Sequence, residues 1–258
     1  MKTENSKDQE PKIEGNENVR QIKFVSEGNM LQGKLFFPEN LNSKKPGLIF
    51  IPSKSQEGQK EYADAVAKKG YLAMTFDLHG YGASQGDAQS AIMASFLNDA
   101  TAAYDQFILD KNVDPEKITA VGSSLGAYLA ILLAERRHIE NLVLQNPANF
   151  PDDVMARPVA DYNRDEPVPE WGQKLARLDS NASLKAVHEF EGNILIVESE
   201  FDEFKAEKAT ENYITSIKDA GQLRHEILVG AKHYLADPLQ RMQYQNKLLA
   251  WLQEKCPT

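Results

Sequence analysis

The chain has 258 residues, with 29 Lys and Arg against 38 Asp and Glu, so its formal net charge is −9 at pH 7. Hydrophobic residues make up 41% and charged residues 26%, a balance typical of an ordinary soluble globular protein, which excludes a disordered chain. The acidic balance argues against a nucleic acid or an anionic membrane as partner. The single cysteine, Cys256, cannot form an internal disulfide, which excludes a disulfide scaffold and favours a cytoplasmic location.

The first 19 residues are polar, with charges of both signs and no apolar core. We expect a disordered tail there and no secretory signal, and a single domain over residues 20–258. The longest uncharged run, 118–134, is interrupted by a Gly-Ser-Ser-Leu-Gly turn and is followed at once by Glu135. It therefore favours a buried strand, a turn and a buried helix over a membrane span.

Strand and helix patterns alternate along the rest of the chain after an N-terminal hairpin. Such alternation predicts an α/β architecture: a mostly parallel, eight-stranded sheet with helices on both faces. The predicted strands cover residues 20–26, 30–37, 47–51, 71–76, 117–121, 141–144, 193–197 and 223–229, and the predicted helices cover 60–69, 87–109, 125–137, 205–220 and 238–255.

The segment 147–191 breaks this rhythm. It contains five prolines, its apolar residues are scattered, and it separates two predicted strands. We expect a small cap inserted over the edge of the sheet, because long segments without regular structure are usually functional. The alternative is a wandering crossover with no role at the functional site.

The pentapeptide Gly122-Ser123-Ser124-Leu125-Gly126 fits the pattern G-x-S-x-G and lies between an apolar strand and an apolar helix. This is the strand–turn–helix context in which a serine nucleophile stands exposed on a sharp turn. Flanking glycines remove side chains that would collide with the strand and the helix. The helix N-terminus favours developing negative charge, so Ser124 is the candidate nucleophile.

A serine hydroxyl needs a base to take its proton. Of the five histidines, His233 directly follows the last predicted strand, and functional loops gather at the carboxyl ends of parallel strands. His79 also follows a strand and is the alternative base. The chain order nucleophile, acid, base favours His233.

The base in turn needs a carboxylate to orient it. Four carboxylates crowd the turn after the strand at 193–197, and of these we favour Asp202, followed by Glu200. A carboxylate one strand earlier, Asp152 or Asp153, is the remaining alternative.

These motifs together resemble the α/β-hydrolase fold superfamily, in particular its small bacterial serine esterase/lipase or serine aminopeptidase-like branch. Besides the serine motif, residues 77–87 (DLHGYGASQGD) resemble the family pattern D-x-x-G-x-G-x-S-x-G, and the likeness runs from Ile22 to Leu252. By position, the resemblance implies the catalytic triad Ser124, Asp202 and His233. It also implies an oxyanion hole made by the backbone N–H groups of Leu125 and Lys54.

The chain differs from the family at two places. Pro52-Ser53 stands where the family usually has His-Gly before the oxyanion donor, and Glu198-Ser199 stands where it tends to have His-Gly before the acid. A main-chain N–H of Lys54 or Ser53 can still serve as the second donor.

The sequence therefore predicts a serine hydrolase, most simply a carboxylesterase, that cleaves an ester, thioester or amide of a small acyl or aromatic group through an acyl-enzyme. We expect no metal and no cofactor, and a small-molecule ester as partner. The physiological substrate, the acyl chain length and the choice between monomer and homodimer stay open. The alternatives are a catalytically silent binding protein with this fold, and an acyltransferase or thioesterase acting on a carrier-bound acyl group.

Overall fold

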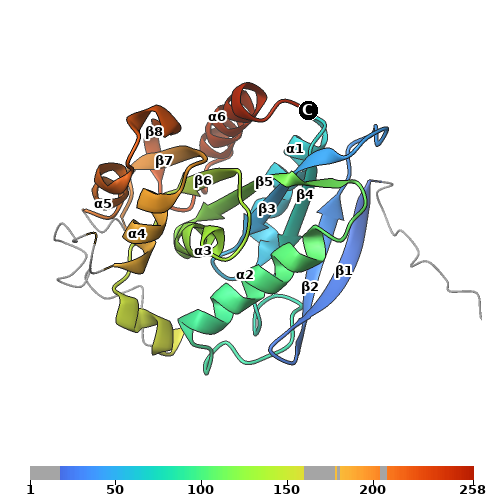
Figure 1. Ribbon diagram of the computed structural model, residues 1–258, viewed down its shortest axis with the longest axis horizontal. Helices are drawn as coiled ribbons and strands as arrows, with labels where there is room; N and C mark the ends of the chain where they lie inside the picture. Colours follow the sequence, from blue (N-terminus) through green and yellow to red (C-terminus); the bar gives the residue numbers. More distant parts are fainter. Residues whose placement is uncertain (1–17, 160–177, 179–180, 204–207) are drawn as a thin grey trace, which may run out of the picture.

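The computed structural model describes residues 18–159, 178, 181–203 and 208–258 (Figure 1). The predicted N-terminal tail up to residue 17 and the middle of the predicted cap, 160–177, lie outside the described residues. Within the described part of the chain, no helix is long and apolar enough to cross a membrane.

An eight-stranded sheet forms the centre of the molecule, in the order β1-β2-β4-β3-β5-β6-β7-β8. β1 pairs antiparallel with β2 and β2 antiparallel with β4, while all other neighbours are parallel. The predicted mostly parallel, eight-stranded sheet is thus confirmed. The strands are β1 (Val19–Ser26), β2 (Asn29–Phe36), β3 (Lys45–Ile51), β4 (Leu72–Phe76), β5 (Val113–Ser123), β6 (Asn141–Gln145), β7 (Asn193–Phe201) and β8 (Leu223–Lys232).

Helices cover both faces of the sheet, as the alternation predicts (Figure 1). One face carries the 3₁₀ turn η1 (Gln56–Gln59), α1 (Lys60–Ala67) and α6 (Pro238–Lys255). The other face carries α2 (Met93–Phe107), α3 (Leu125–Ala134), α4 (Ala182–Glu189) and α5 (Ala209–Ser216). Two further 3₁₀ turns, η2 (Asp152–Ala156) and η6 (Ala220–Gln222), lie in connections.

α3 is buried along nearly its whole length, from Leu125 to Leu133. It packs on β5 and lies between α2 and α4, so apolar residues surround it on every side. A helix that is apolar all round is stable only in such a position. The residue before α3, Ser124, is consequently placed at a rigid point between the central strand and the central helix.

Four predicted helices end earlier than expected: α1 at Ala67 and not 69, α2 at Phe107 and not 109, α3 at Ala134 and not 137, and α5 at Ser216 and not 220. The helix predicted from residue 87 begins at Met93, because Asp87 closes a turn in which its carboxylate accepts bonds from Gln89 N (3.0 Å) and Ser90 Oγ (3.0 Å). The helix predicted over 205–220 is α5, which ends at Ser216. Asp219 then caps η6 by accepting from Gly221 N at 2.8 Å.

The sequence prediction misses α4, which lies inside the segment expected to be a cap. Asn181 caps this helix through a bond from Leu184 N to its side-chain oxygen (3.1 Å). Leu184 and Val187 are buried in the same core as α3, so α4 belongs to the helical layer of the domain. The cap expected over 147–191 stays a prediction for residues 160–177 and 179–180, which lie outside the described residues.

Candidate active site

The turn between β5 and α3 holds Ser124 in a conformation that L-residues rarely adopt, with φ 54° and ψ −118°. Such a backbone costs on the order of 1–3 kcal/mol and persists only where the surroundings enforce it. Here Ser124 N donates to the carbonyl of Gln145 (2.9 Å), and the Ser124 carbonyl accepts from Ala127 N (3.0 Å) and Ala148 N (3.2 Å). The serine therefore stands at a fixed position at the carboxyl end of the sheet.

Both glycines of the motif are required by close backbone contacts. A Cβ on Gly122 would lie 2.2 Å from the carbonyl oxygen of Gly126, and a Cβ on Gly126 would lie 2.1 Å from that of Ile51. Neither neighbour is a flexible side chain that could move aside. The sharp turn from β5 into α3 thus depends on glycine at both positions.

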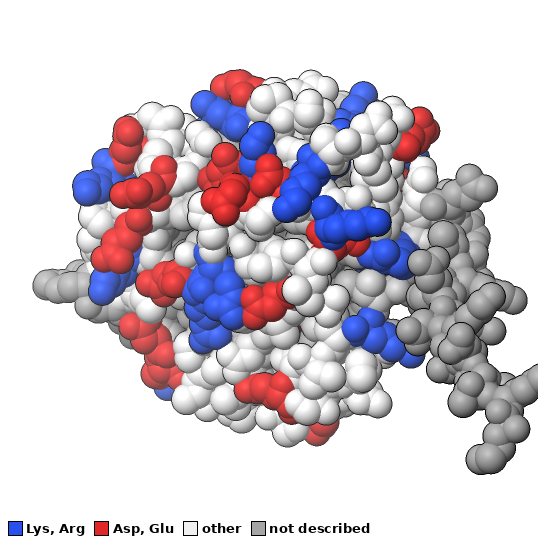
Figure 2. All heavy atoms as spheres, turned by 45° about the vertical axis from the view of Figure 1, so that its right-hand side comes forward, with Lys and Arg blue, Asp and Glu red and all other residues white. Residues whose placement is uncertain are grey.

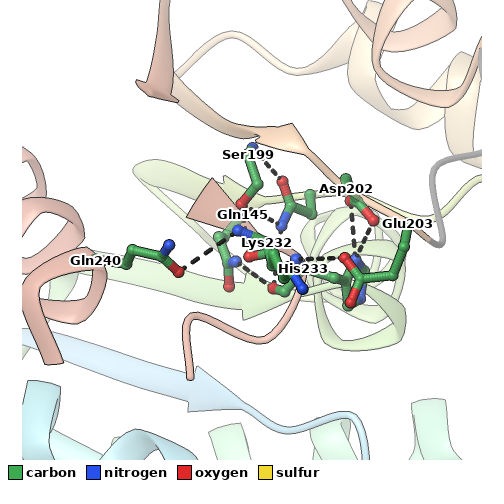
Figure 3. Close-up of polar contacts among 8 residues, drawn as sticks. Gln145, Ser199, Asp202, Glu203, Lys232, His233 and Gln240 are labelled. Atoms are coloured by element: carbon green, nitrogen blue, oxygen red, sulfur yellow. Dashed lines mark hydrogen bonds and ion pairs between the residues drawn. The ribbon is translucent and has the colours of Figure 1, made fainter. Parts of the chain in front are cut away.

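His233 lies directly after β8, and its ring contacts Asp202, which lies directly after β7. His233 Nδ1 is 2.8 Å from both carboxylate oxygens of Asp202 (Figure 3). The side chains are only 7% and 5% exposed. Because a carboxylate accepts hydrogen bonds, the neutral ring carries its proton on Nδ1 and leaves Nε2 as the basic nitrogen.

Ser124 and His233 line one cavity of about 510 Å³ at the carboxyl ends of β3, β5 and β6. Its walls come from the β3–α1 connection and from the loop between β8 and α6. Most of the surface that lines the cavity is apolar, and its aromatic and aliphatic residues include Phe50, Tyr62, Val121, Tyr234, Leu235 and Tyr244. Four charged residues also line it: Lys54, Glu57, Glu61 and Arg241. Arg241 is held by Glu61 at 3.2 Å and by two loop carbonyls.

Of the two amides expected to stabilise an oxyanion, that of Leu125 directly follows Ser124 and that of Lys54 lies in the β3–α1 connection, which lines the cavity. Leu125 is the first residue of α3, where main-chain N–H groups lack partners within the helix. Lys54 follows Ser53, whose hydroxyl donates to the carbonyl of Ser123 at 2.7 Å. The Lys54 carbonyl accepts from Leu78 N at 3.1 Å. The loop that replaces His-Gly by Pro-Ser is therefore tied directly to the nucleophile turn.

The motif at 77–87 contacts one wall of this cavity through Asp77. The Asp77 carboxylate accepts from Gln56 N (2.8 Å), Gln56 Nε2 (3.1 Å) and Ala83 N (3.1 Å). Gln56 opens η1, which lines the cavity through its neighbours. Asp77 thus links the loop after β4 to the wall of the cavity.

The residues considered as the alternative base and the alternative acid make other contacts. His79 is buried with its Nδ1 2.8 Å from Asp99 Oδ2 on α2, and this bond raises the pKa of His79 above its ordinary value. It does not line the cavity that holds Ser124. Glu200 accepts from Gly230 N (2.8 Å), and Asp152 accepts from Ala182 N (2.7 Å). Asp153 pairs with Arg157. Of the four carboxylates weighed as acid, Asp202 is the one shown here in contact with the His233 ring.

Sequence reasoning missed two amides beneath this constellation, Gln145 and Asn146. Both side chains donate to the main-chain oxygen of His233, at 3.1 and 3.2 Å. Their one visible signal is a polar pair that follows the apolar run 142–144 and stands just before Pro147.

The central parallel sheet, the hairpin at its edge and the serine turn at its carboxyl end define the α/β-hydrolase fold, and the chain has this fold. A model of the serine aminopeptidase S33 family matches residues 54–178, which include the 77–87 motif and Ser124. The match supports a hydrolase of the α/β-hydrolase superfamily.

Two curated proteins share part of this sequence. An uncharacterised protein of Mycobacterium tuberculosis is 29% identical over 130 residues, which is 50% of this chain and 45% of that protein. The human mitochondrial palmitoyl-protein thioesterase ABHD10 is 28% identical over 123 residues, or 46% of this chain and 38% of that protein. The matched region therefore spans less than half the length of either relative.

Solved structures share the fold over almost the whole chain. Est1E from Butyrivibrio proteoclasticus, in a structure with bound ferulic acid, covers 92% of this chain with all of its own, at a TM-score of 0.73 and 18% identity. The α/β hydrolase GrgF from a Penicillium species covers 93% of this chain with 99% of its own, at a TM-score of 0.70 and 16% identity.

Proposed function

We propose that this protein is a serine hydrolase that cleaves carboxylic esters of small acyl or aromatic groups, with Ser124 as nucleophile, His233 as base and Asp202 as the orienting acid. The observation that carries the proposal is the buried 2.8 Å contact between His233 and Asp202, next to a cavity that Ser124 and His233 both line. The matched family and the esterase-named and thioesterase-named relatives support the same class of reaction.

In the first half of the reaction, Ser124 Oγ attacks the carbonyl carbon of the ester while His233 Nε2 takes the hydroxyl proton. The carbonyl electrons move to oxygen and form a tetrahedral oxyanion. When this intermediate collapses, the bond to the leaving alcohol breaks and His233 returns its proton to that oxygen. An acyl-enzyme on Ser124 is left.

In the second half, His233 takes a proton from water, whose oxygen attacks the acyl carbon. The second tetrahedral intermediate then expels Ser124 Oγ, which recovers the proton from His233. Asp202 stays ionised throughout and stabilises the imidazolium that forms in each half.

The N–H groups of Leu125 and Lys54 are the proposed oxyanion donors. The former gains from its place at the N-terminus of α3, where the amide dipoles favour negative charge. The latter depends on the Ser53 hydroxyl, which holds its loop against Ser123.

The lining of the cavity favours an acyl or leaving group with aromatic or apolar surface, because Phe50, Tyr62, Tyr234 and Tyr244 face it. Thioesters are the second candidate substrate class. A thioesterase is named among the relatives that share part of this sequence, and the same triad chemistry cleaves both bonds.

The test is a hydrolysis panel of aryl esters and acyl thioesters of graded chain length, run on the wild type, Ser124→Ala and Ser123→Ala. We expect Ser124→Ala to abolish turnover with the fold intact, and Ser123→Ala, the adjacent serine of the same motif, to keep most of it. Wild-type rates in Ser124→Ala would overturn the proposal. Product analysis with an added alcohol or amine separates hydrolysis from acyl transfer.

A further inference from the structure

Two side-chain amides lie at the carboxyl end of β6, between the strand that leads to Ser124 and the strand that leads to Asp202. They belong to Gln145 and Asn146, whose residues are 6% and 5% exposed. Neither has a part in the proton transfers described above. Figure 3 shows the Gln145 side chain beside His233, with a dashed line to the His233 carbonyl.

Gln145 contacts both the nucleophile and the base. Its main-chain oxygen accepts from Ser124 N at 2.9 Å, and its side-chain Nε2 donates to the His233 carbonyl at 3.1 Å (Figure 3). One residue therefore joins the two groups between which the proton must pass.

Asn146 adds three bonds around the same carbonyl. Its Nδ2 donates to His233 O (3.2 Å) and to Ser199 Oγ (3.0 Å), and its Oδ1 accepts from Ser199 N (2.7 Å). Ser199 Oγ in turn donates to the carbonyl of Lys232 (3.1 Å). Asn146 makes these contacts from a left-handed backbone with φ 45°, a conformation that asparagine adopts more readily than most residues other than glycine.

These bonds connect the His233 loop to the end of β6, two segments that the sheet does not pair with each other. His233 follows β8, the edge strand, and β7 separates β8 from β6, so no ladder of main-chain bonds joins the His233 loop to β6 or β5. A loop after an edge strand has a neighbouring strand on one side alone, and here that side supplies the contacts of His233 with Asp202 and of His233 N with Glu203 Oε2 (3.3 Å). Two buried amide donors on one carbonyl restrict the movement of this loop, because breaking them would leave polar groups buried without partners.

We propose that Gln145 and Asn146 form an amide clamp that sets the position of the His233 ring relative to Ser124. We class both as positioning residues, because their side chains bond to the main-chain oxygen of His233 and not to its ring, although Gln145 also lines the cavity. The inference rests on the proposed function for its catalytic consequence. It adds to that function a second set of residues on which proton transfer depends.

Two variants remove the clamp without adding charge. Gln145→Met keeps the main-chain bond to Ser124 and deletes only the donor to His233. Asn146→Gly deletes all three side-chain bonds and is compatible with the left-handed backbone. The control is Asn141→Ala, at the opposite end of the same strand, where another buried amide donates to Thr119 Oγ1 (3.3 Å) and accepts from Asn193 Nδ2 (2.9 Å).

For an aryl ester, we expect kcat to fall about 10- to 100-fold in each clamp variant while KM changes little, because misplacement of the base slows the chemical step. The rate of Ser124 labelling by a fluorophosphonate should fall in parallel. Asn141→Ala should lower the melting temperature, and the folded protein should keep the kcat and the labelling rate of the wild type. If the clamp variants lose activity only in proportion to the folded fraction, as Asn141→Ala does, their role is structural and the inference is wrong.

A second readout does not depend on activity. In protein with isotopically labelled histidine, the Nδ1 proton of His233 gives an NMR signal that reports its bond to Asp202. We expect this signal to move or broaden in Gln145→Met and Asn146→Gly and to stay in place in Asn141→Ala. An unchanged signal in both clamp variants overturns the clamp.

The two readouts separate the clamp from the hydrolase proposal. A wild type that neither hydrolyses esters nor takes the label overturns the proposed function, while the NMR comparison still decides whether the amides position His233. Gln145→Met loses a single bond, so it keeps the test decisive if Asn146→Gly fails to fold.

Discussion

Ser124, the proposed nucleophile, has a strained backbone. Its positive-φ backbone is enforced by two glycines and by main-chain bonds to α3 and to the segment at the end of β6, so the position of this residue is fixed before any substrate arrives. Such preorganisation is what a nucleophile requires, because no reorganisation is then needed during the reaction.

At the same scale, the choice between Asp202 and Glu200 can be decided by two isosteric changes. Asp202→Asn should lower kcat on the order of 10⁴-fold, because an amide favours the wrong tautomer of His233. Glu200→Gln should stay within a few-fold of the wild type, since Glu200 contacts Gly230 N and not the ring. Steady-state kinetics on one aryl ester measure both. The reverse ranking would exclude Asp202 as the acid.

Ser53 offers a sharper test of the unusual oxyanion loop. Ser53→Gly restores the residue usual in the family but removes the 2.7 Å bond to Ser123. A lost hydrogen bond of about 0.5–1.5 kcal/mol predicts a fall in kcat of roughly 2- to 12-fold, because the Lys54 amide is held less firmly. Ser55→Gly, two residues on, is the matched control. A rise in kcat for Ser53→Gly would show that the hydroxyl does not hold the loop in its active form.

Much of this site could be predicted residue by residue. Ser124, Asp202 and His233 each follow a strand, and strand ends meet at one edge of a parallel sheet. The roles of Gln145 and Asn146 could not be predicted, because a side-chain bond to the His233 carbonyl depends on how the loop after β8 folds back over β6. The Ser53 bond depends likewise on the path of a loop and not on a pattern.

At the scale of elements, the 77–87 loop and η1 form one unit through Asp77. A Cβ on Gly82 would lie 2.4 Å from the Asp77 carboxyl group, so this glycine allows the loop to close over the carboxylate. The family motif is therefore explained here by packing around Asp77 and not by contact with the reacting groups.

Gly82→Ala should accordingly destabilise the fold more than another left-handed glycine does. Gly28→Ala is the control, since Gly28 has φ +81° and nothing within 4 Å of the added Cβ. We expect Gly28→Ala to show the backbone cost alone, on the order of 1 kcal/mol in the free energy of unfolding, and Gly82→Ala to exceed it clearly. Urea unfolding of both variants measures the difference. If both variants lose the same free energy of unfolding, the Asp77 side chain can move away from the added Cβ at no further cost.

Element boundaries show where sequence patterns fail. α6 begins and ends where the pattern predicts, because Asp237 and Pro238 mark its start. α2 begins late because the helical spacing of 87–92 is overridden by the Asp87 turn, and α4 is missed because its short apolar face lies among prolines and polar residues. Local capping bonds decide these ends, and they are visible only once the loops are placed.

At the scale of the whole molecule, the net charge of −9 is spread among opposite charges. Figure 2 shows basic and acidic side chains interspersed on the face in view, without a large area of one sign on that face. The alternation of strands and helices predicts the layered architecture at this scale because each apolar face can be buried in few ways.

Overall stability should carry a pH dependence from the buried contact between His79 and Asp99. The bond to Asp99 raises the pKa of His79 in the folded state above the value of about 6.5 expected in the unfolded chain. Its contribution is therefore complete below about pH 6.5 and is lost as the pH rises through the folded-state pKa. We expect the free energy of unfolding to decline over that range in the wild type, and the decline to be absent in His79→Gln.

His138, whose side chain is 56% exposed, supplies the control for this dependence. His138→Gln should keep the wild-type slope in urea unfolding followed from pH 6 to pH 9. A slope that survives in His79→Gln would assign the dependence to other groups.

The proposed function is tested most directly by mass spectrometry of the intact protein after reaction with a fluorophosphonate. A single adduct is expected on the wild type, mapped by peptide analysis to Ser124, formed much more slowly in Asp202→Asn and absent from Ser124→Ala. An adduct on another residue, or equal labelling of Ser124→Ala, would show that the turn between β5 and α3 does not carry the nucleophile.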